Sequence, residues 1–476
     1  MKYSFFFLIS LVCAVLTLVS CEKSPGFRVS SKNVIIDAFQ EEPVTIDISA
    51  GVEWTVTVIH PDVEWLTVNP MQGKGNATIT IEANENPDFT ERTALIAISG
   101  NGVRTDTVMV VQLPDVDIFE KLLDEAFREY CLKEFDNEPK DGKISTSEAR
   151  SVTTINAGRL QIKSLAGIEF FTRLTKLNCR DNNIESLDLS KNLALRELNC
   201  YNNAIKSLEL SNNPELWYLE CSYNPITHID VSELSKLQDL FIHSTELTNI
   251  DVSKNAKLRW LAVSNNKVSN IDVSNNKELQ GLECSGNGLT DLNVSGNSQL
   301  RTLYCGDNQL RRLNLENNSA LAQLYCNNNL LDNLNLSNNT ALESLNCSNN
   351  SINTLDLTNC LKLTELYCNT LLLKSLTLNN NTGLKQLHCD GNEQLTSLDL
   401  SNNINLEGLR CSGSNLRDEI DISSNNRLNY IDLQGNNQLL KIKVWPGFIK
   451  TNSNYKKSEK AGWYKKDEDG NWVKVP

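Results

Sequence analysis

Histidine is scarce in this sequence. The 476 residues contain 4 histidines, His60, His228, His243 and His388, and none lies in a metal-ligand or protease motif. Cys389 directly follows His388, and consecutive side chains of a strand point to opposite faces, so these two cannot form a thiol–imidazole pair. A glycine-rich phosphate-binding loop is also missing. These absences argue against an enzyme, and the sequence predicts no catalytic residue.

Basic residues do not outnumber acidic ones. The chain has 45 Lys and Arg against 59 Asp and Glu, which gives a net charge of -14. A nucleic-acid-binding protein needs a basic surface to meet the phosphates. The charge balance therefore argues against nucleic acid as a partner.

Long apolar runs are missing except at the N-terminus. The run from Phe5 to Val19 follows Lys2 and has the length of a signal-peptide core. It is too short to span a membrane. No transmembrane segment is expected in the rest of the chain.

The end of this run, Leu18-Val19-Ser20-Cys21, resembles a bacterial lipobox. The resemblance implies that residues 1–20 are a lipoprotein signal peptide, that Cys21 is acylated on its thiol and amine, and that 21–26 form a linker. A protein without another apolar anchor needs more than one acyl chain to stay on a membrane. Because Glu22 stands where an inner-membrane retention signal has aspartate, we expect the outer membrane, with exposure at the cell surface left open. The alternative is an ordinary secreted protein whose signal contains a cysteine.

What the chain has in abundance is a repeat of 21 residues. The stretch Leu174–Asn192, LTKLNCRDNNIESLDLSKN, returns along most of the sequence. A fixed period of this length indicates stacked units rather than a globular core. One position shows the register, with Ile242 and Val263 in its gap: Cys179, Cys200, Cys221, Cys284, Cys305, Cys326, Cys347, Cys368, Cys389 and Cys411.

The repeat resembles the bacterial leucine-rich repeats, L-x-x-L-x-L-x-x-N with a second half L-x-x-L-D-L-x-x-N, over residues 152–443. The resemblance implies a leucine-rich-repeat solenoid with a parallel β-sheet and a mostly non-helical convex side. One unit cannot fold alone. Its five or six apolar side chains contribute about 1.5–3 kcal/mol each on burial, whereas fixing the backbone costs about 1–2 kcal/mol per residue. Neighbouring units must therefore share one core.

Asparagine and cysteine have separate roles in this scheme. Asn182 and its equivalents are expected to satisfy backbone groups at one bend, and Asn192 and its equivalents form a second series that includes Cys360. Export usually favours disulfides. The periodicity instead predicts that the cysteines point inward as small apolar fillers with free thiols.

Residues 27–113 contain short β-rich runs separated by turn residues, which predicts a small β-sandwich. Trp54, Trp65, Gly73, Arg92 and Gln112 are among the residues whose order resembles a BACON domain, an immunoglobulin-like module of Bacteroidetes surface proteins. The resemblance implies carbohydrate or mucin binding. The alternative is a spacer, in which both tryptophans are core residues.

Residues 114–151 combine a helical pattern with an acidic loop. The helix is expected to cap the open first turn of the solenoid. The loop resembles an EF-hand or dockerin-like calcium loop, and the resemblance implies Asp136, Asp141 and Glu148 as calcium ligands. Pro139 departs from that pattern, so a degenerate loop remains the alternative. No other cofactor is indicated.

Aromatic residues recur on the outward side of the predicted strands. Such a row offers a protein or a sugar a contact surface of low conformational entropy. The alternative is that aromatic residues pack well on sheets and shield their neighbours. The candidate ligand-binding residues are Trp217, Tyr218, Phe241, Trp260, Tyr304, Tyr325 and Tyr367.

Residues 444–476 hold Trp463, Tyr464 and Trp472 among many lysines and predict a C-terminal cap, with a basic, aromatic binding patch as the alternative. Three hypotheses for function follow. The sheet face binds a protein, that face or the sandwich binds a glycan, or the chain is a scaffold without a ligand. In each case we expect a monomer with a lipid anchor as its membrane attachment.

Overall fold

The computed structural model describes residues 27–38, 40, 42–59, 64–86, 90–137, 140–450 and 452–475. The predicted signal peptide and Cys21 lie outside these residues. The chain forms two compact units: the first runs to Asp117 and includes Ser145–Ser147, and the second comprises Ile118–Ile144 and the chain from Glu148 onward. In the described part of the chain, no helix is both long enough and apolar enough to cross a membrane.

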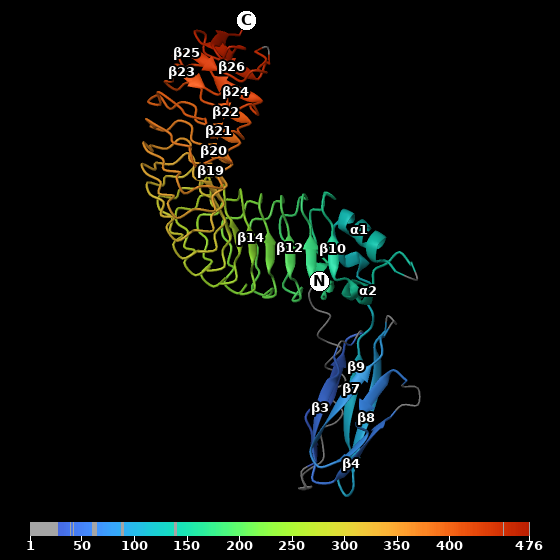
Figure 1. The fold of residues 1–476 in the computed structure, drawn as a ribbon. Helices are drawn as coiled ribbons and strands as arrows, with labels where there is room; N and C mark the ends of the chain where they lie inside the picture. Colours follow the sequence, from blue (N-terminus) through green and yellow to red (C-terminus); the bar gives the residue numbers. More distant parts are fainter. Residues whose placement is uncertain are drawn as a thin grey trace. The chain divides into compact units, whose positions relative to one another are not determined.

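The first unit is the predicted β-sandwich (Figure 1). All its strand pairs are antiparallel except β2 with β9. One sheet has the order β1 (Arg28–Val29), β3 (Val44–Ser49), β7 (Ala77–Ala83), β5 (Leu66–Asn69). The other has the order β2 (Asn33–Ile36), β9 (Asp106–Gln112), β8 (Arg92–Gly100), β4 (Glu53–Val58), β6 (Gln72–Lys74).

Alternation of apolar and polar residues creates the sandwich core. In β4, Trp54 and Val56 are buried while Thr55 and Thr57 are exposed, as a strand with one buried face requires. Gln112 is fully buried at the end of β9, and its side-chain amide Nε2 donates to the backbone oxygens of Ala38 and Asn84. The unit therefore has a complete core of its own.

The second unit begins with helices that cover the first coils. They are η1 (Phe119–Lys121), α1 (Glu125–Phe135), α2 (Thr146–Ser151) and η2 (Ile168–Phe170). Asp124 caps α1 by accepting a hydrogen bond from the Phe127 amide, 3.0 Å away. Phe127 is buried, and its ring lies 6.3 Å from that of Phe171 in the first coils. Leu123, between η1 and the cap of α1, is exposed.

Parallel three- and four-residue strands then form one 15-stranded sheet, which Figure 1 shows along the inner side of a curved solenoid. This confirms the predicted leucine-rich-repeat architecture. In register order the strands are β10 (Thr154–Asn156), β11 (Lys176–Asn178), β12 (Glu197–Asn199), β13 (Tyr218–Glu220), β14 (Asp239–Phe241), β15 (Trp260–Ala262), β16 (Gly281–Glu283), β17 (Thr302–Tyr304), β18 (Gln323–Tyr325), β19 (Ser344–Asn346), β20 (Glu365–Tyr367), β21 (Gln386–His388), β22 (Gly408–Arg410), β24 (Tyr430–Leu433) and β26 (Tyr455–Lys457).

Both asparagine series bind backbone groups of neighbouring coils, as the sequence predicts. Asn182 Nδ2 donates to the carbonyls of Ala157 and Cys179, and its Oδ1 accepts from the Ile162 amide. Asn192 Nδ2 donates to the carbonyls of Ile168 and Phe171. The residue before the first-series asparagine has a positive φ in most coils, for example 55° at Asp181. The backbone groups of each bend therefore find some of their hydrogen-bond partners in the adjacent coil.

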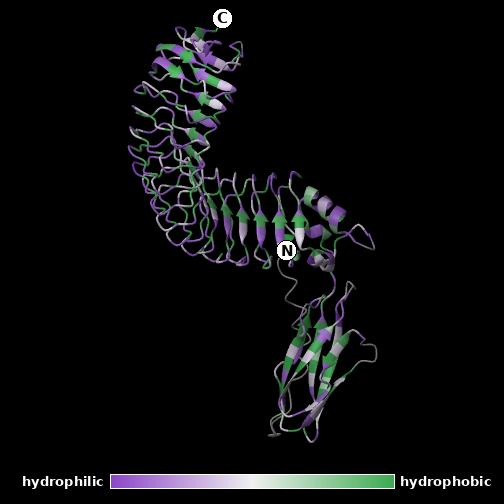
Figure 2. Cartoon of the chain, viewed as in Figure 1, coloured by the Kyte–Doolittle hydropathy of each residue, from purple (hydrophilic) through white to green (hydrophobic). Residues whose placement is uncertain are grey.

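The cysteine column lies inside the solenoid. Cys284, Cys305 and Cys326 are fully buried, and every cysteine in the described residues is unpaired. Burial raises the pKa of Cys284 to about 12, so this thiol stays protonated at neutral pH. Figure 2 shows hydrophobic and hydrophilic residues alternating along the solenoid, which is the pattern of a shared narrow core.

The C-terminal residues do more than cover the last coil. Strand β26 continues the solenoid sheet, and a second sheet has the order β23 (Arg417–Asp421), β25 (Gln438–Lys443), β27 (Gly462–Lys466), β28 (Trp472–Lys474). Trp463 is buried against Phe448, with ring centroids 4.7 Å apart. Trp472 is half-buried, with Lys443 and Lys466 over its ring.

Candidate ligand-binding face

The outward side of the solenoid sheet carries two side chains per strand, on either side of an inward leucine. In β13 these are Tyr218 and Glu220, which flank the buried Leu219. The parallel register places Tyr218 beside Asp239 and Glu220 beside Phe241. Residues 21 positions apart in the sequence are therefore neighbours about 4.8 Å apart on this face.

Four of the predicted aromatic residues form one group, which we call the early cluster: Trp217, Tyr218, Phe241 and Trp260. The Tyr218 ring lies 5.9 Å from the Trp217 ring and 5.7 Å from the Phe241 ring. All four side chains are half-buried. Each ring is thus fixed by packing yet keeps part of its surface open to solvent.

Residues of the next coil hold the Trp260 side chain in place. A Cβ at Gly281 would lie 2.5 Å from the indole, so the ring occupies the space that a side chain would otherwise fill. The Trp260 Nε1 donates a hydrogen bond to Glu283 Oε1 at 3.1 Å. The indole is therefore oriented at both its face and its edge.

Carboxylates are interleaved with these rings, and the sequence-based list of candidate residues does not include them. Glu220, Asp239 and Glu283 occupy the same outward positions as the aromatic residues. Burial raises the pKa of Glu220, opposed by hydrogen bonds from Ser222. Burial also raises the pKa of Asp239, opposed by the charge of Arg259. The signal that could have found them is the 21-residue register, which places each carboxylate beside an aromatic residue.

A histidine completes the group. His243 Nε2 lies 4.0 Å from Glu283 Oε2, and the His243 ring lies 6.3 Å from Phe241. In the sequence, His243 belongs to no metal-ligand or protease motif and was not a candidate site residue. His228, by contrast, is exposed in a loop away from these contacts.

The three predicted tyrosines do not extend the early cluster as one row. Tyr304 and Tyr325 stack at 4.7 Å with an angle of 18° between their rings. The Tyr304 hydroxyl donates to Gln323 Oε1, and the Tyr325 hydroxyl lies 3.3 Å from Ser344 Oγ. Tyr367 instead pairs with His388, with ring centroids 4.7 Å apart. These tyrosines brace neighbouring coils, which matches the packing alternative as well as a binding role.

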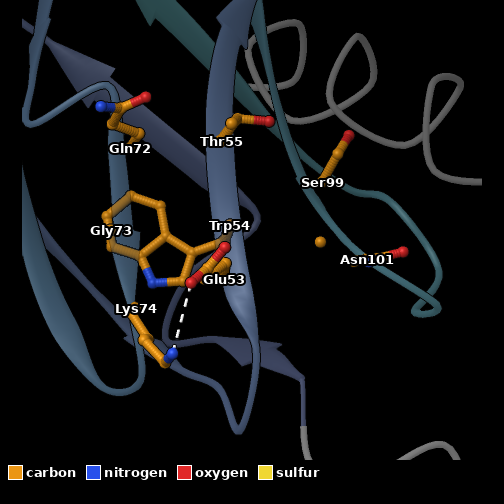
Figure 3. A pocket seen from close by; sticks show the side chains of 9 residues that line it. Glu53, Trp54, Thr55, Gln72, Gly73, Lys74, Ser99 and Asn101 are labelled. Carbon is orange, nitrogen blue, oxygen red and sulfur yellow. Dashed lines mark hydrogen bonds and ion pairs between the residues drawn. The ribbon is translucent and has the colours of Figure 1, made fainter.

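The sandwich has a hollow with both polar and apolar lining at one end, shown in Figure 3. Its side chains come from β4, β6 and β8 and from the turn after β8, and Lys74 Nζ lies 3.3 Å from Glu53 Oε1. Trp54 borders this hollow but is only 2% exposed, and its Nε1 donates to the Gly75 carbonyl. Trp65 is partly buried beneath the guanidinium of Arg92. Trp54 is therefore a core residue and not a platform for sugar rings.

The three predicted calcium ligands bind backbone amides of their own loop. Asp136 Oδ2 accepts from Gly142, Asp141 Oδ1 accepts from Lys143, and Glu148 Oε1 accepts from Asn137. Within the described residues, no three Asp, Glu, His or Cys side chains form a group that could hold a metal ion. Asp136 Oδ1 is buried without a hydrogen-bond partner among the described residues, so calcium ligation by Asp136, Asp141 and Glu148 stays a prediction beside the degenerate-loop alternative.

Comparisons with known proteins agree with both units. The BACON family, described as "Putative binding domain, N-terminal", matches residues 53–113. No curated protein matches this chain. Among solved structures, the chain is similar to the functional domain of InlJ from Listeria monocytogenes, which includes a cysteine ladder, at 32% identity over 69% of this chain and 75% of that chain, with a TM-score of 0.64.

Two further structures share the fold at lower identity. YopM, a leucine-rich effector protein from Yersinia pestis, is 22% identical over 71% of this chain and 91% of that chain, with a TM-score of 0.56. An internalin, inlF from Listeria monocytogenes, is 21% identical over 72% of this chain and 97% of that chain, with a TM-score of 0.54. The predicted BACON and leucine-rich-repeat resemblances are both confirmed.

Proposed function

This chain belongs to the bacterial leucine-rich-repeat proteins and carries a BACON domain, and we propose that it is a non-catalytic recognition protein that binds a protein ligand on the sheet face of its solenoid. Leucine-rich-repeat and BACON modules are generally binding modules without catalytic activity. The ligand would contact the early cluster.

The observation that carries this proposal is the early cluster itself. Its aromatic rings are half-buried and are held by ring contacts of 5.7–5.9 Å and by the hydrogen bond from Trp260 to Glu283. Side chains already fixed by packing lose little conformational entropy when a partner binds. Tyrosine and tryptophan are also the residues that contribute most to protein interfaces.

The location is part of the same proposal. We take Cys21 as the lipidated residue and the outer membrane as the site of attachment, on the resemblance of residues 18–21 to a lipobox. Protease treatment of intact cells tests the orientation. Cleavage of the repeats in intact cells would support a surface adhesin, whereas full protection would restrict the ligand to the periplasm.

Alanine substitution tests the face. The triple variant Trp217→Ala, Tyr218→Ala, Trp260→Ala removes the largest rings of the early cluster. Each such contact residue typically contributes about 1–2 kcal/mol or more. We therefore expect the purified chain to lose at least tenfold in affinity for whole cells, measured by flow cytometry with fluorescent protein.

A matched control removes apolar surface elsewhere on the solenoid. Leu193, Leu361 and Ile404 are exposed outside the strands, so their triple alanine variant should bind as the parent does. Circular dichroism establishes that both variants are folded. Equal binding by the parent and the early-cluster variant would exclude this face and favour a scaffold role.

A second candidate function is glycan binding by the sandwich. The hollow in Figure 3 is lined by polar groups that can bond to hydroxyls, including Gln72, Ser99 and Asn101, and the matching family is described as a binding domain. A glycan array with residues 27–113 tests it, because this unit has its own core. Binding that disappears in Gln72→Ala would support the sandwich as a lectin, and silence across the array would remove it.

A further inference from the structure

Acidic and aromatic side chains alternate across four neighbouring coils of the sheet face. One outward row reads Tyr218, Asp239, Trp260, and the adjacent row reads Glu220, Phe241, Ala262, Glu283. Each carboxylate therefore has an aromatic neighbour in an adjacent strand or in the adjacent row. We call Glu220, Asp239 and Glu283 the carboxylate group.

The carboxylate group differs from Glu197 and Asp390 because its members are not ion-paired with lysine or arginine among the described residues, although the charge of Arg259 acts on Asp239. Glu197 is paired with Lys176 at 2.6 Å, and Asp390 is paired with Arg410 at 3.0 Å. Within the described residues, no member of the carboxylate group forms an ion pair with lysine or arginine. Glu283 instead contacts Trp260 Nε1 and His243 Nε2, and Glu220 Oε1 accepts from the Ser222 amide.

These charges are also partly removed from water. The Glu283 side chain is 23% exposed. Burial raises the pKa of Glu220 and of Asp239, which disfavours their charged forms. A carboxylate that is partly desolvated and lacks a basic partner interacts more strongly with an incoming cation than a fully solvated one does. The faces of tryptophan, tyrosine and phenylalanine attract the same cations.

We propose that the early cluster and the carboxylate group together bind lysine or arginine side chains of a basic segment in a partner protein. The inference rests on the proposed function, because it names the chemistry of the ligand for the same face. Charge complementarity selects the partner: carboxylates and ring faces both favour a cation, and both would disfavour an acidic segment.

The spacing of the coils sets the size of that segment. Glu220 and Glu283 lie three strands apart, or roughly 14 Å at about 4.8 Å per strand. An extended peptide advances about 3.3 Å per residue, so basic residues four positions apart span roughly 13 Å. The face can therefore engage two basic side chains of one extended segment, with Asp239 between them.

Fluorescence anisotropy with a labelled nona-arginine peptide tests the proposal on the full chain. The variant Glu220→Gln, Asp239→Asn, Glu283→Gln should bind the probe at least tenfold more weakly than the parent. The variant Glu185→Gln, Glu278→Gln, Asp291→Asn makes the same change in net charge at exposed residues outside the strands, and should stay within about twofold. A labelled nona-glutamate peptide should not bind.

Two results would overturn the proposal. Equal weakening by the two charge-matched variants would show that the probe senses only the net charge of -14. Unchanged binding by the carboxylate variant would show that the group does not meet the cation. A circular dichroism spectrum and melting temperature like those of the parent establish that the carboxylate variant is folded.

Cell binding separates this proposal from the one on which it rests. If the early-cluster alanine variant loses cell binding while the carboxylate variant keeps it, the face is the site but the partner is not basic. If both variants keep full cell binding, the proposed function itself fails. Loss in both variants, together with the anisotropy result, supports both.

Discussion

Gly281 determines where Trp260 lies. The indole covers the position that a Cβ would occupy and reaches Glu283 with its Nε1. The absence of a side chain on one coil therefore orients the largest ring on the preceding coil. Small residues on this face are as important to its geometry as the aromatic residues themselves.

Replacing Gly281 with alanine should displace the indole. The new Cβ would meet the ring at 2.5 Å, so Trp260 must rotate and its hydrogen bond to Glu283 should be lost. NMR of the chain labelled with 15N-tryptophan reports this, with Trp260→Phe identifying the indole signal. Gly288→Ala is the control, because its nearest neighbour is at 3.9 Å. An unmoved Trp260 signal in Gly281→Ala would contradict the packing described.

The titration of Glu220 gives a pH-dependent contribution to stability. Its folded pKa is raised above the ordinary 4.5, chiefly by burial, so the folded state binds this proton more tightly than the unfolded state. The stabilisation is complete below pH 4.5 and is lost as pH rises through the folded pKa. The melting temperature of Glu220→Gln minus that of the parent should therefore increase as the pH rises from 4.5 through the folded pKa. Above the folded pKa this difference should level off. A difference that stays constant from pH 4 to 8 would show that burial does not act on Glu220.

At the scale of the element, a strand of three residues cannot hold itself in a sheet. The buried side chains and the asparagine amides supply the missing stability. Asn297 is fully buried, and its Nδ2 donates to the carbonyls of Val273 and Asn276 on the preceding coil. The coil-to-coil bonds of this series are side chain to backbone, so they depend on asparagine itself.

Truncating one asparagine of the second series should weaken the solenoid. Asn297→Ala removes two buried hydrogen bonds and is expected to cost about 1–3 kcal/mol of unfolding free energy. Asn275 is exposed three residues after Asp272 in the preceding unit, and Asn275→Ala should change stability by less than about 0.5 kcal/mol. Urea unfolding followed by circular dichroism measures both. Equal effects of the two variants would show that the buried amide contributes nothing specific.

At the scale of the whole molecule, the described residues form two separate cores. One extends without interruption from Ile118 through the coils to Trp463, and the other belongs to the sandwich. Stability along a solenoid is shared between neighbours, whereas a sandwich folds around its own interior. The two units are therefore expected to unfold in separate transitions.

Trp54→Ala should destabilise the sandwich alone. It removes a fully packed indole and the hydrogen bond to Gly75, at a cost of about 3–5 kcal/mol. Calorimetry should show one transition at lower temperature and the solenoid transition unchanged. Ile35→Ala, at an exposed position of β2, should leave the temperatures of both transitions unchanged. If Trp54→Ala lowered both transitions equally, the chain would unfold as one cooperative unit.

The sequence by itself determined the solenoid. Leucine, cysteine and asparagine return every 21 residues, and stacking such units buries the cysteines and gives the asparagine Nδ2 groups backbone acceptors, as Cys305 and Asn297 show. It also placed the aromatic residues on the outward face, because side chains alternate along a strand. The sandwich followed from the same alternation in runs such as residues 53–58.

Tertiary structure alone decided what those outward residues do. Whether a tyrosine meets solvent or braces the next coil depends on partners such as Gln323 and Ser344. In the acidic loop, only the assembled structure shows that Asp136 and Asp141 accept hydrogen bonds from local N–H groups. The partial desolvation of Glu220 and Asp239 depends on rings from neighbouring coils. Burial is a property of the assembled surface and not of a residue's place in the repeat.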